Sequence, residues 1–145
     1  MRYGKHLMQD VILNDEEDSL RLANENEIKK ILSDLIKISE MTLVEPVQAH
    51  QFPSASYSRN IPGGITAFGI LSESHISIHT WPENNYFSLD LFSCRNFDEK
   101  KIESAIKKIF KVKKIDSKTV ERGISVNFPK ELKYLPRYLA VALKN

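Results

Sequence analysis

The alternation of hydrophobic and polar residues predicts strands interrupted by amphipathic helices. Residues from His6 to Leu13 alternate loosely, which indicates a first strand. Apolar residues then recur every three or four positions from Ile28 to Ile38, so a helix is expected to begin somewhere between Ser19 and Asn26. Because the apolar residues form one stripe, this helix is expected to cover another layer with one side.

The middle of the chain predicts a sheet of antiparallel neighbours. Thr42–Val44 and Val47–Phe52 suggest a second strand that is broken or at an edge, because the proline between them cannot donate a hydrogen bond. Residues 53–64 have turn and loop chemistry, which is typical of a binding loop or a mobile segment. Strand-like runs then follow at 65–71, 76–80 and 86–93, and they predict a meander.

The last third adds a second helix and a further strand. Asn96 or Asp98 can cap a helix whose apolar stripe runs from Ile102 to Phe110. Another strand is expected around residues 118–126, and a short helix over 132–142. Paired strands with two amphipathic helices predict an α+β fold, a two-layer α/β sandwich with an antiparallel sheet and helices on one face. The sheet's other face would need a cover, which predicts a dimer.

Composition narrows the class of protein. A chain of 145 residues with 41% hydrophobic and 28% charged residues fits a single globular domain over 1–145. The net charge of +2 gives no indication of a nucleic-acid partner. The single cysteine, Cys94, suits a reducing compartment, and no run reaches the ~18 apolar residues needed to cross a bilayer. We therefore expect a cytoplasmic protein without a membrane partner.

Reactive side chains gather between Leu71 and Glu83, interleaved with isoleucines that mark a buried strand. A zinc site at His75 and His79 is disfavoured, because residues four apart in a strand are about 13 Å apart, and no metal is expected. A hydrolase with Ser72 or Ser74 as nucleophile, His79 as base and Asp90 as orienting acid lacks the glycine-flanked turn that such a nucleophile needs.

A third chemistry uses the backbone itself. A serine hydroxyl can attack the carbonyl of the preceding residue, and elimination from the resulting ester leaves dehydroalanine, which hydrolyses to a pyruvoyl group. Such self-processing needs a base, hydrogen-bond donors for an oxyanion and a dry, rigid pocket. Ser74 follows Glu73, with His79 one short strand away and a hydroxyl at Thr66 on the preceding strand. These residues could supply the required groups.

Three segments together resemble the small prokaryotic class of S-adenosylmethionine decarboxylases, which are pyruvoyl enzymes of spermidine biosynthesis. They are Gly4–Leu7, Ser72–Glu83 and Leu89–Cys94. The resemblance implies cleavage between Glu73 and Ser74, giving a β chain of residues 1–73 and an α chain of residues 74–145. Ser74 would become the pyruvoyl group, which forms a Schiff base with the substrate amine and acts as an electron sink. Two β and two α chains would form a homodimer.

The resemblance also implies roles for individual residues. His79 would be the processing base, Cys94 the proton donor in turnover, and Thr66 would stand where the family has a processing serine. Glu83 resembles the glutamate that binds the substrate's ribose hydroxyls. Trp81 is either a wall of the substrate site or a packing residue.

The chain departs from the family pattern ahead of Ser74, where a phenylalanine stacks on adenine. Aligned without gaps, that position is Asn60, and the family's Ser-Gly pair is Thr66-Ala67. With an insertion in the loop, Phe52 becomes the stacking residue, and Tyr57 is another candidate. Two alternatives therefore stay open. One is a pyruvoyl-dependent decarboxylase of ornithine or arginine, and the other is an unprocessed regulatory homologue, which Thr66 supports.

Overall fold

The structure, a computed structural model, describes residues 4–54 and 62–125. Two of the candidate stacking residues, Tyr57 and Asn60, lie outside these ranges, as does the helix expected over 132–142.

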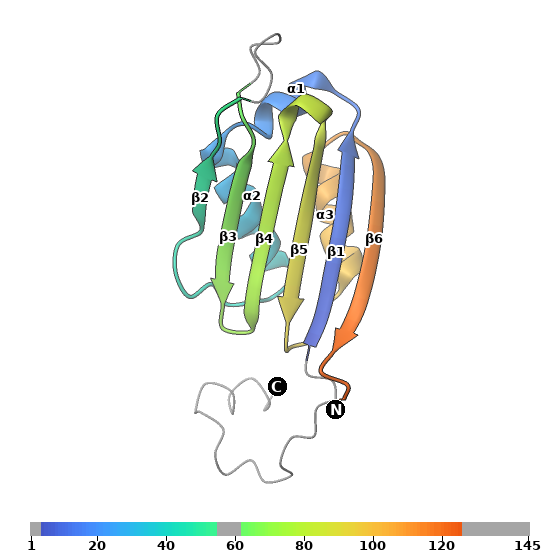
Figure 1. Cartoon of the computed structure of the whole chain (residues 1–145). Coiled ribbons are helices and arrows are strands. Elements are labelled where there is room, and N and C mark those ends of the chain that lie inside the picture. The colour runs from blue at the N-terminus through green and yellow to red at the C-terminus, as the bar shows by residue number, and fades with distance from the viewer. Residues whose placement is uncertain (1–3, 55–61, 126–145) are drawn as a thin grey trace.

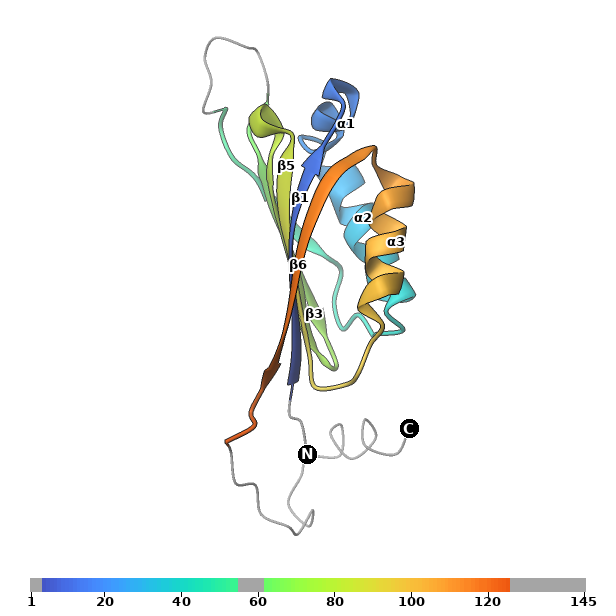
Figure 2. The ribbon, with the colours of Figure 1, turned by 90° about the vertical axis from the view of Figure 1, so that its right-hand side faces the viewer.

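The described chain forms one antiparallel sheet of six strands with its long helices on one side. The strand order is β2-β3-β4-β5-β1-β6. Figures 1 and 2 show α2 and α3 packed behind the sheet, and no helix or strand of residues 4–54 and 62–125 lies on its other face. This arrangement confirms the predicted two-layer α/β sandwich. The strands are β1 (Gly4–Leu13), β2 (Gln48–Gln51), β3 (Ile65–Leu71), β4 (Ser74–Trp81), β5 (Tyr86–Ser93) and β6 (Val112–Arg122). The helices are α1 (Glu16–Arg21), α2 (Glu25–Ile38), the 3-10 turn η1 (Pro82–Asn84) and α3 (Glu99–Ile109).

The regular spacing of apolar residues predicted most strands and helices at their observed positions. The bounds of β3 and β5 are those predicted, and α2 begins inside the predicted window, where the Asn24 side chain accepts a hydrogen bond from the Glu27 N–H. Asp98, rather than Asn96, caps α3. The predicted second strand is reduced to β2 at the sheet edge, and its first part makes a single bridge between Leu43 and Leu71.

One expectation was wrong, and one helix was not predicted. The first strand stops at Leu13 as expected, but the acidic residues after it begin α1, a six-residue helix that the sequence did not indicate. The last strand was expected around residues 118–126, but β6 runs from Val112 to Arg122. Because β6 is an edge strand and most of its side chains are exposed, its sequence lacks the alternation that marks a half-buried strand.

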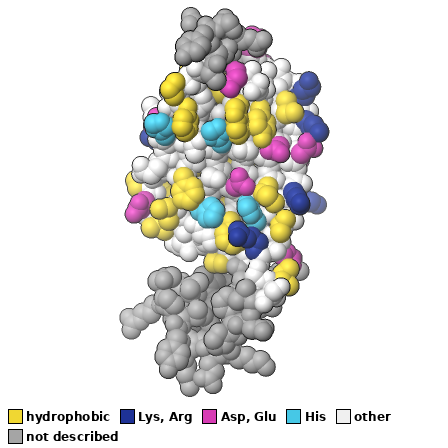
Figure 3. Space-filling model, viewed as in Figure 1, with side chains coloured by type: hydrophobic (Ala, Val, Ile, Leu, Met, Phe, Trp, Pro, Cys, Tyr) yellow, Lys and Arg dark blue, Asp and Glu magenta, His cyan; other side chains and the backbone are white. Residues whose placement is uncertain are grey.

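The core lies between the sheet and the helices. Along β4, the buried side chains are Ile76, Ile78 and Thr80, so His75, Ser77, His79 and Trp81 point to the uncovered face. Phe68 and Ile70 are 40% and 45% exposed on that face. Figure 3 shows hydrophobic and histidine side chains spread over it. A sheet face of this kind is unusual for a monomer, because large apolar side chains are normally covered.

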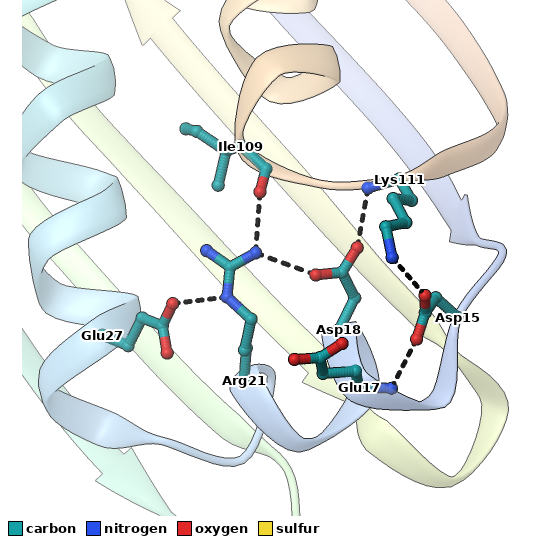
Figure 4. Close-up of polar contacts among 7 residues, drawn as sticks. All are labelled: Asp15, Glu17, Asp18, Arg21, Glu27, Ile109 and Lys111. Carbon is teal, nitrogen blue, oxygen red and sulfur yellow. Dashed lines mark hydrogen bonds and ion pairs between the residues drawn. The ribbon is translucent and has the colours of Figure 1, made fainter.

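A cluster of ion pairs attaches α1 to the two long helices (Figure 4). Asp18, 7% exposed, accepts hydrogen bonds from the Lys111 backbone N–H at 2.6 Å and from Arg21 Nη1 at 2.8 Å. Arg21 also donates to the Ile109 carbonyl at 2.7 Å and to Glu27 at 2.5 Å. The short helix is therefore held by tertiary contacts.

Candidate active site

Ser74 occupies a strained position in the turn between β3 and β4. Leu71 pairs with Ser74, so Ser72 and Glu73 form a two-residue turn. The φ angle of Ser74 is +146°, a region that only glycine adopts without cost. The sequence singled out this serine from its neighbours, but nothing in the sequence indicated the strain.

The segment that follows α2 holds this turn from one side. The Thr42 carbonyl accepts from the Ser72 N–H at 2.9 Å, and the Thr42 N–H donates to the Glu73 carboxylate at 3.0 Å. Two residues further along each segment from the Thr42–Ser72 bond, the Val44 N–H donates to the Ile70 carbonyl at 2.9 Å. These three contacts fix the turn in place, which is the condition under which a strained backbone persists.

The carbonyl before Ser74 is bound by a backbone donor from the end of β5. The Cys94 N–H donates to the Glu73 oxygen at 2.9 Å, and Ser93 pairs with Ser74 across the ladder. An N–H aimed at a carbonyl oxygen can stabilise the negative charge that develops there when a nucleophile attacks. Cys94 is exposed, and it lines a cavity of about 460 Å³ together with Lys5 and Arg95. Glu73, Ser74 and Cys94 are called the Ser74 group below.

Thr66 and His79 form a second group, on the uncovered face. They are opposite one another in the β3–β4 ladder, and the Thr66 hydroxyl is hydrogen-bonded to His79 Nδ1. Burial lowers the pKa of His79 below its ordinary 6.5, although the nearby Glu83 carboxylate acts in the opposite direction. The imidazole is therefore neutral near pH 7 and able to accept a proton.

Aromatic rings surround His79. Trp81 lies edge-on at 4.0 Å between ring centroids, and the Phe52 ring lies at 6.0 Å. Trp81 also stacks on Tyr86 at 4.8 Å, so it packs within the sheet face as well as bordering His79. Glu83 follows in η1. Thr66, His79, Trp81, Phe52 and Glu83 are called the His79 group.

One chain does not bring the two groups together. Ser74 begins β4 and His79 follows five residues later in the same strand, which separates them by roughly 16 Å at a rise of ~3.3 Å per residue. From the sequence, His79 was expected to lie close enough to act on Ser74 within one chain. In the fold, the predicted site residues are divided between the two ends of β4.

The described residues give no support to a serine hydrolase or to a zinc site. Asp90, the proposed orienting acid of a hydrolase, contacts His6 at 3.1 Å and pairs with Ser77 in the ladder, whereas His79 pairs with Ser88. Within residues 4–54 and 62–125, no group of three His, Cys, Asp or Glu residues is arranged to hold a metal ion. His75 and His79 do lie in a strand, as the rejection of a zinc pair required.

His75 belongs to a separate cluster on the uncovered face. Its ring lies between Phe68, stacked at 5.5 Å, and Phe92 at 5.7 Å. Burial lowers the pKa of His75, and the charges of His6 and Arg122 lower it further, while Asp90 opposes them. His75 follows Ser74 directly in β4, and the ring contacts that it makes are with these two phenylalanines.

Comparison with known proteins identifies the family. The family model for S-adenosylmethionine decarboxylase matches residues 5–123. This chain belongs to the S-adenosylmethionine decarboxylase family. The match covers both groups of site residues, so it extends the resemblance seen in the sequence to the full length of the sheet.

Relatives and a solved structure agree with this assignment. A Methanococcus maripaludis S-adenosylmethionine decarboxylase proenzyme is 40% identical over 98 residues, 67% of this chain and 73% of the relative. The Methanococcus aeolicus proenzyme is 33% identical over 124 residues, 85% of this chain and 96% of the relative. The crystal structure of the Aquifex aeolicus adenosylmethionine decarboxylase matches with a TM-score of 0.66 and 28% identity, covering 90% of this chain and 98% of that one.

Membership of the family also bears on the cofactor. Members of the S-adenosylmethionine decarboxylase family depend on a pyruvoyl group formed from an internal serine, and the relatives are named as proenzymes. Among the helices that the structure describes, none is long and apolar enough to cross a membrane.

Proposed function

We propose that this chain cuts itself between Glu73 and Ser74 and then decarboxylates S-adenosylmethionine. The cut would give the β chain 1–73 and the α chain 74–145. The observation that carries the proposal is the pairing of a strained Ser74 with a preceding carbonyl that already accepts the Cys94 N–H. Among the serines of the turn and of β4, Ser74 alone has a positive φ.

The first step moves the acyl group of Glu73 from nitrogen to oxygen. The Ser74 hydroxyl oxygen attacks the Glu73 carbonyl carbon, the C–N bond breaks, and the Ser74 nitrogen takes up the hydroxyl proton. The negative charge on the carbonyl oxygen is stabilised by the Cys94 N–H. Breaking the peptide bond frees the backbone of Ser74 from its strained φ, so the ground-state strain favours this step.

The second step releases the β chain. A base removes the Cα proton of Ser74, the C–O bond breaks, and Glu73 leaves as a free carboxylate. The dehydroalanine that remains takes up water and loses ammonia, which leaves the pyruvoyl group. That group supplies an electron sink for the substrate once its carboxylate has left as carbon dioxide. Cys94, next to the same carbonyl, is the residue assigned to return a proton to the substrate.

His79 is the base, acting from a second copy of the chain. Within one chain it is too far from Ser74, but an antiparallel pairing of two uncovered sheet faces lays the Ser74 group of each copy over the His79 group of the other. A two-fold axis lying between the sheets and across their strands makes both sites equivalent. The exposed Phe68 and Ile70 side chains on this face support its burial in a homodimer.

Phe52 is the residue proposed to stack on adenine. It lies beside His79 and makes an edge contact with His50 at 4.8 Å, which favours the alignment with an insertion in the loop. A base–aromatic stack contributes on the order of 1–3 kcal/mol. Glu83, in the same group, is assigned to the ribose hydroxyls. Membership of the family supports S-adenosylmethionine over ornithine or arginine and over a non-catalytic regulatory role.

Intact mass spectrometry of the purified protein tests the proposal. Two fragments, residues 1–73 and a pyruvoyl-terminated 74–145, are expected, and Ser74→Ala should leave one chain. Carbon dioxide release should be fastest from S-adenosylmethionine when compared with ornithine and arginine. A chain that remains whole on long incubation would overturn self-processing, and faster release from an amino acid would overturn the substrate.

A further inference from the structure

The Glu73 side chain is buried, although it ends in a polar carboxyl group. It is 6% exposed, and among the described residues only Asp18 is another buried acidic side chain. Burying a carboxylate is costly unless it is hydrogen-bonded or paired. The Thr42 N–H meets Oε2 at 3.0 Å, and Arg95 Nη1 lies 3.9 Å from Oε1. The fold therefore holds this side chain with one hydrogen bond, from Thr42, and one longer ion pair, from Arg95.

Glu73 is thus anchored at both its carbonyl and its side chain. The carbonyl is bound by the Cys94 N–H after β5, and the carboxylate by the Thr42 N–H after α2. These two segments are far apart in sequence and approach the turn from different places. Two anchors on one residue restrict the orientation of the peptide bond that follows it, in addition to the Ser72 N–H bond to the Thr42 carbonyl that holds the turn as a whole.

We propose that the Glu73 carboxylate is a positioning group for self-processing, holding the Glu73–Ser74 peptide in the strained geometry from which Ser74 attacks. This inference rests on the cleavage proposed above. The Glu73 carboxylate only orients the peptide, and it neither donates nor accepts a proton. The attacking oxygen and the leaving nitrogen both belong to Ser74.

The test compares cleavage rates of full-length variants by intact mass over time. Glu73→Ala removes the anchor and should slow cleavage on the order of 10-fold or more, because small misplacements of reacting atoms reduce rates strongly. Glu73→Gln keeps an oxygen for the Thr42 N–H and should remain within about threefold of wild type, since only the distant Arg95 pairing is lost. Glu73→Asp withdraws the carboxylate by one methylene and should be slower than Glu73→Gln. The exposed Glu40→Gln is the matched control and should leave the rate unchanged.

A second measurement identifies the step at which Glu73 acts. Hydroxylamine cuts an ester but leaves a peptide bond intact under the same mild conditions. Glu73→Ala should accumulate uncut chain that resists hydroxylamine, because the acyl shift itself is slow. His79→Ala should accumulate an ester that hydroxylamine cuts, because only elimination is blocked. Complete hydroxylamine cleavage of Glu73→Ala would contradict a role in positioning the attack.

Variants that cannot be cleaved distinguish a loss of folding from a loss of positioning. Ser74→Ala and Ser74→Ala/Glu73→Ala should both give cooperative thermal unfolding and the same oligomeric state. If the double variant does not fold, the order of Glu73→Gln and Glu73→Asp decides, and equal rates for these two would overturn the proposal. Uncut wild-type protein would defeat the proposed function itself. Cut wild type with Glu73→Ala at the same rate would defeat the positioning role alone.

Discussion

Ser74 combines a reactive hydroxyl with a backbone conformation that favours glycine. If its φ of +146° is strained, replacing it by glycine should relieve strain that alanine keeps. In the uncut state, Ser74→Gly should therefore be about 1–2 kcal/mol more stable than Ser74→Ala. Denaturant unfolding at equal protein concentration measures the difference. Equal stabilities would show that the turn stores no strain at this residue.

Cys94 contributes two different groups, which a single substitution separates. Its backbone N–H binds the Glu73 carbonyl, while its thiol is exposed. Cys94→Ala keeps the N–H, so substantial cleavage should persist while turnover falls because the proton donor is missing. Fragment mass and carbon dioxide release report the two steps separately. Unchanged turnover would remove the thiol from the mechanism, and loss of cleavage would show that the thiol also serves processing.

His79 gives a pH dependence of known sign. Its pKa is lowered by burial, so the neutral, basic imidazole predominates near pH 7 and is lost only as the pH falls below 6.5. The cleavage rate should be level around neutral pH and decline on the acid side. His75→Gln, which changes a histidine outside both site groups, should keep this profile. A rate that rises as the pH falls would contradict the assignment of His79 as the base.

At the scale of elements, the ion-pair cluster should account for much of the attachment of α1 (Figure 4). Asp18→Ala leaves the Lys111 N–H without its partner and removes one of the partners of Arg21, and it should lower the free energy of unfolding by about 2–3 kcal/mol. The neighbouring Glu17→Ala removes an exposed carboxylate and should change stability by less than about 0.5 kcal/mol. Unfolding curves of both variants, made on the uncut Ser74→Ala chain, provide the comparison. Equal losses would contradict the role of the cluster.

Elements that bury a regular set of side chains could be predicted from the sequence. The helices α2 and α3 and the strands β3 to β5 are of this kind, because their regular burial produces a periodic pattern of apolar residues. The short α1 has no such stripe and depends on contacts with residues near 109–111, which are remote in sequence. The edge strand β6 exposes most side chains, so its start could not be found from alternation.

The sequence proposed members of the candidate site but gave little of their arrangement. Residue types and their order drew attention to Ser74 and His79, and the resemblance to the family added a role for Cys94. The hydrogen bond from the Cys94 N–H and the anchoring of Glu73 by Thr42 depend on backbone positions that any residue type provides. The separation of Ser74 from His79 follows from β4, which runs from Ser74 to Trp81 and was expected only over 76–80.

At the scale of the whole molecule, the uncovered sheet face and the distance between the Ser74 group and the His79 group both favour an antiparallel dimer. Among the described residues, the long helices cover one face of the sheet (Figure 2), and Phe68 and Ile70 are exposed on the other. An antiparallel dimer would bury that face and complete both sites at once. In the proposed mechanism, the Ser74 group has no base within its own chain, and the His79 group does not contain the bond to be cut.

Co-expression of two inactive variants tests cleavage between copies most directly. Ser74→Ala cannot be cut but retains His79, and His79→Ala retains Ser74 but lacks the base, so each alone should give no completed cleavage. In mixed dimers, the Ser74→Ala copy should supply His79 to its partner, and intact mass should show His79→Ala chains cut into residues 1–73 and 74–145. His79→Ala chains that remain uncut in mixed dimers would contradict a site shared between two copies.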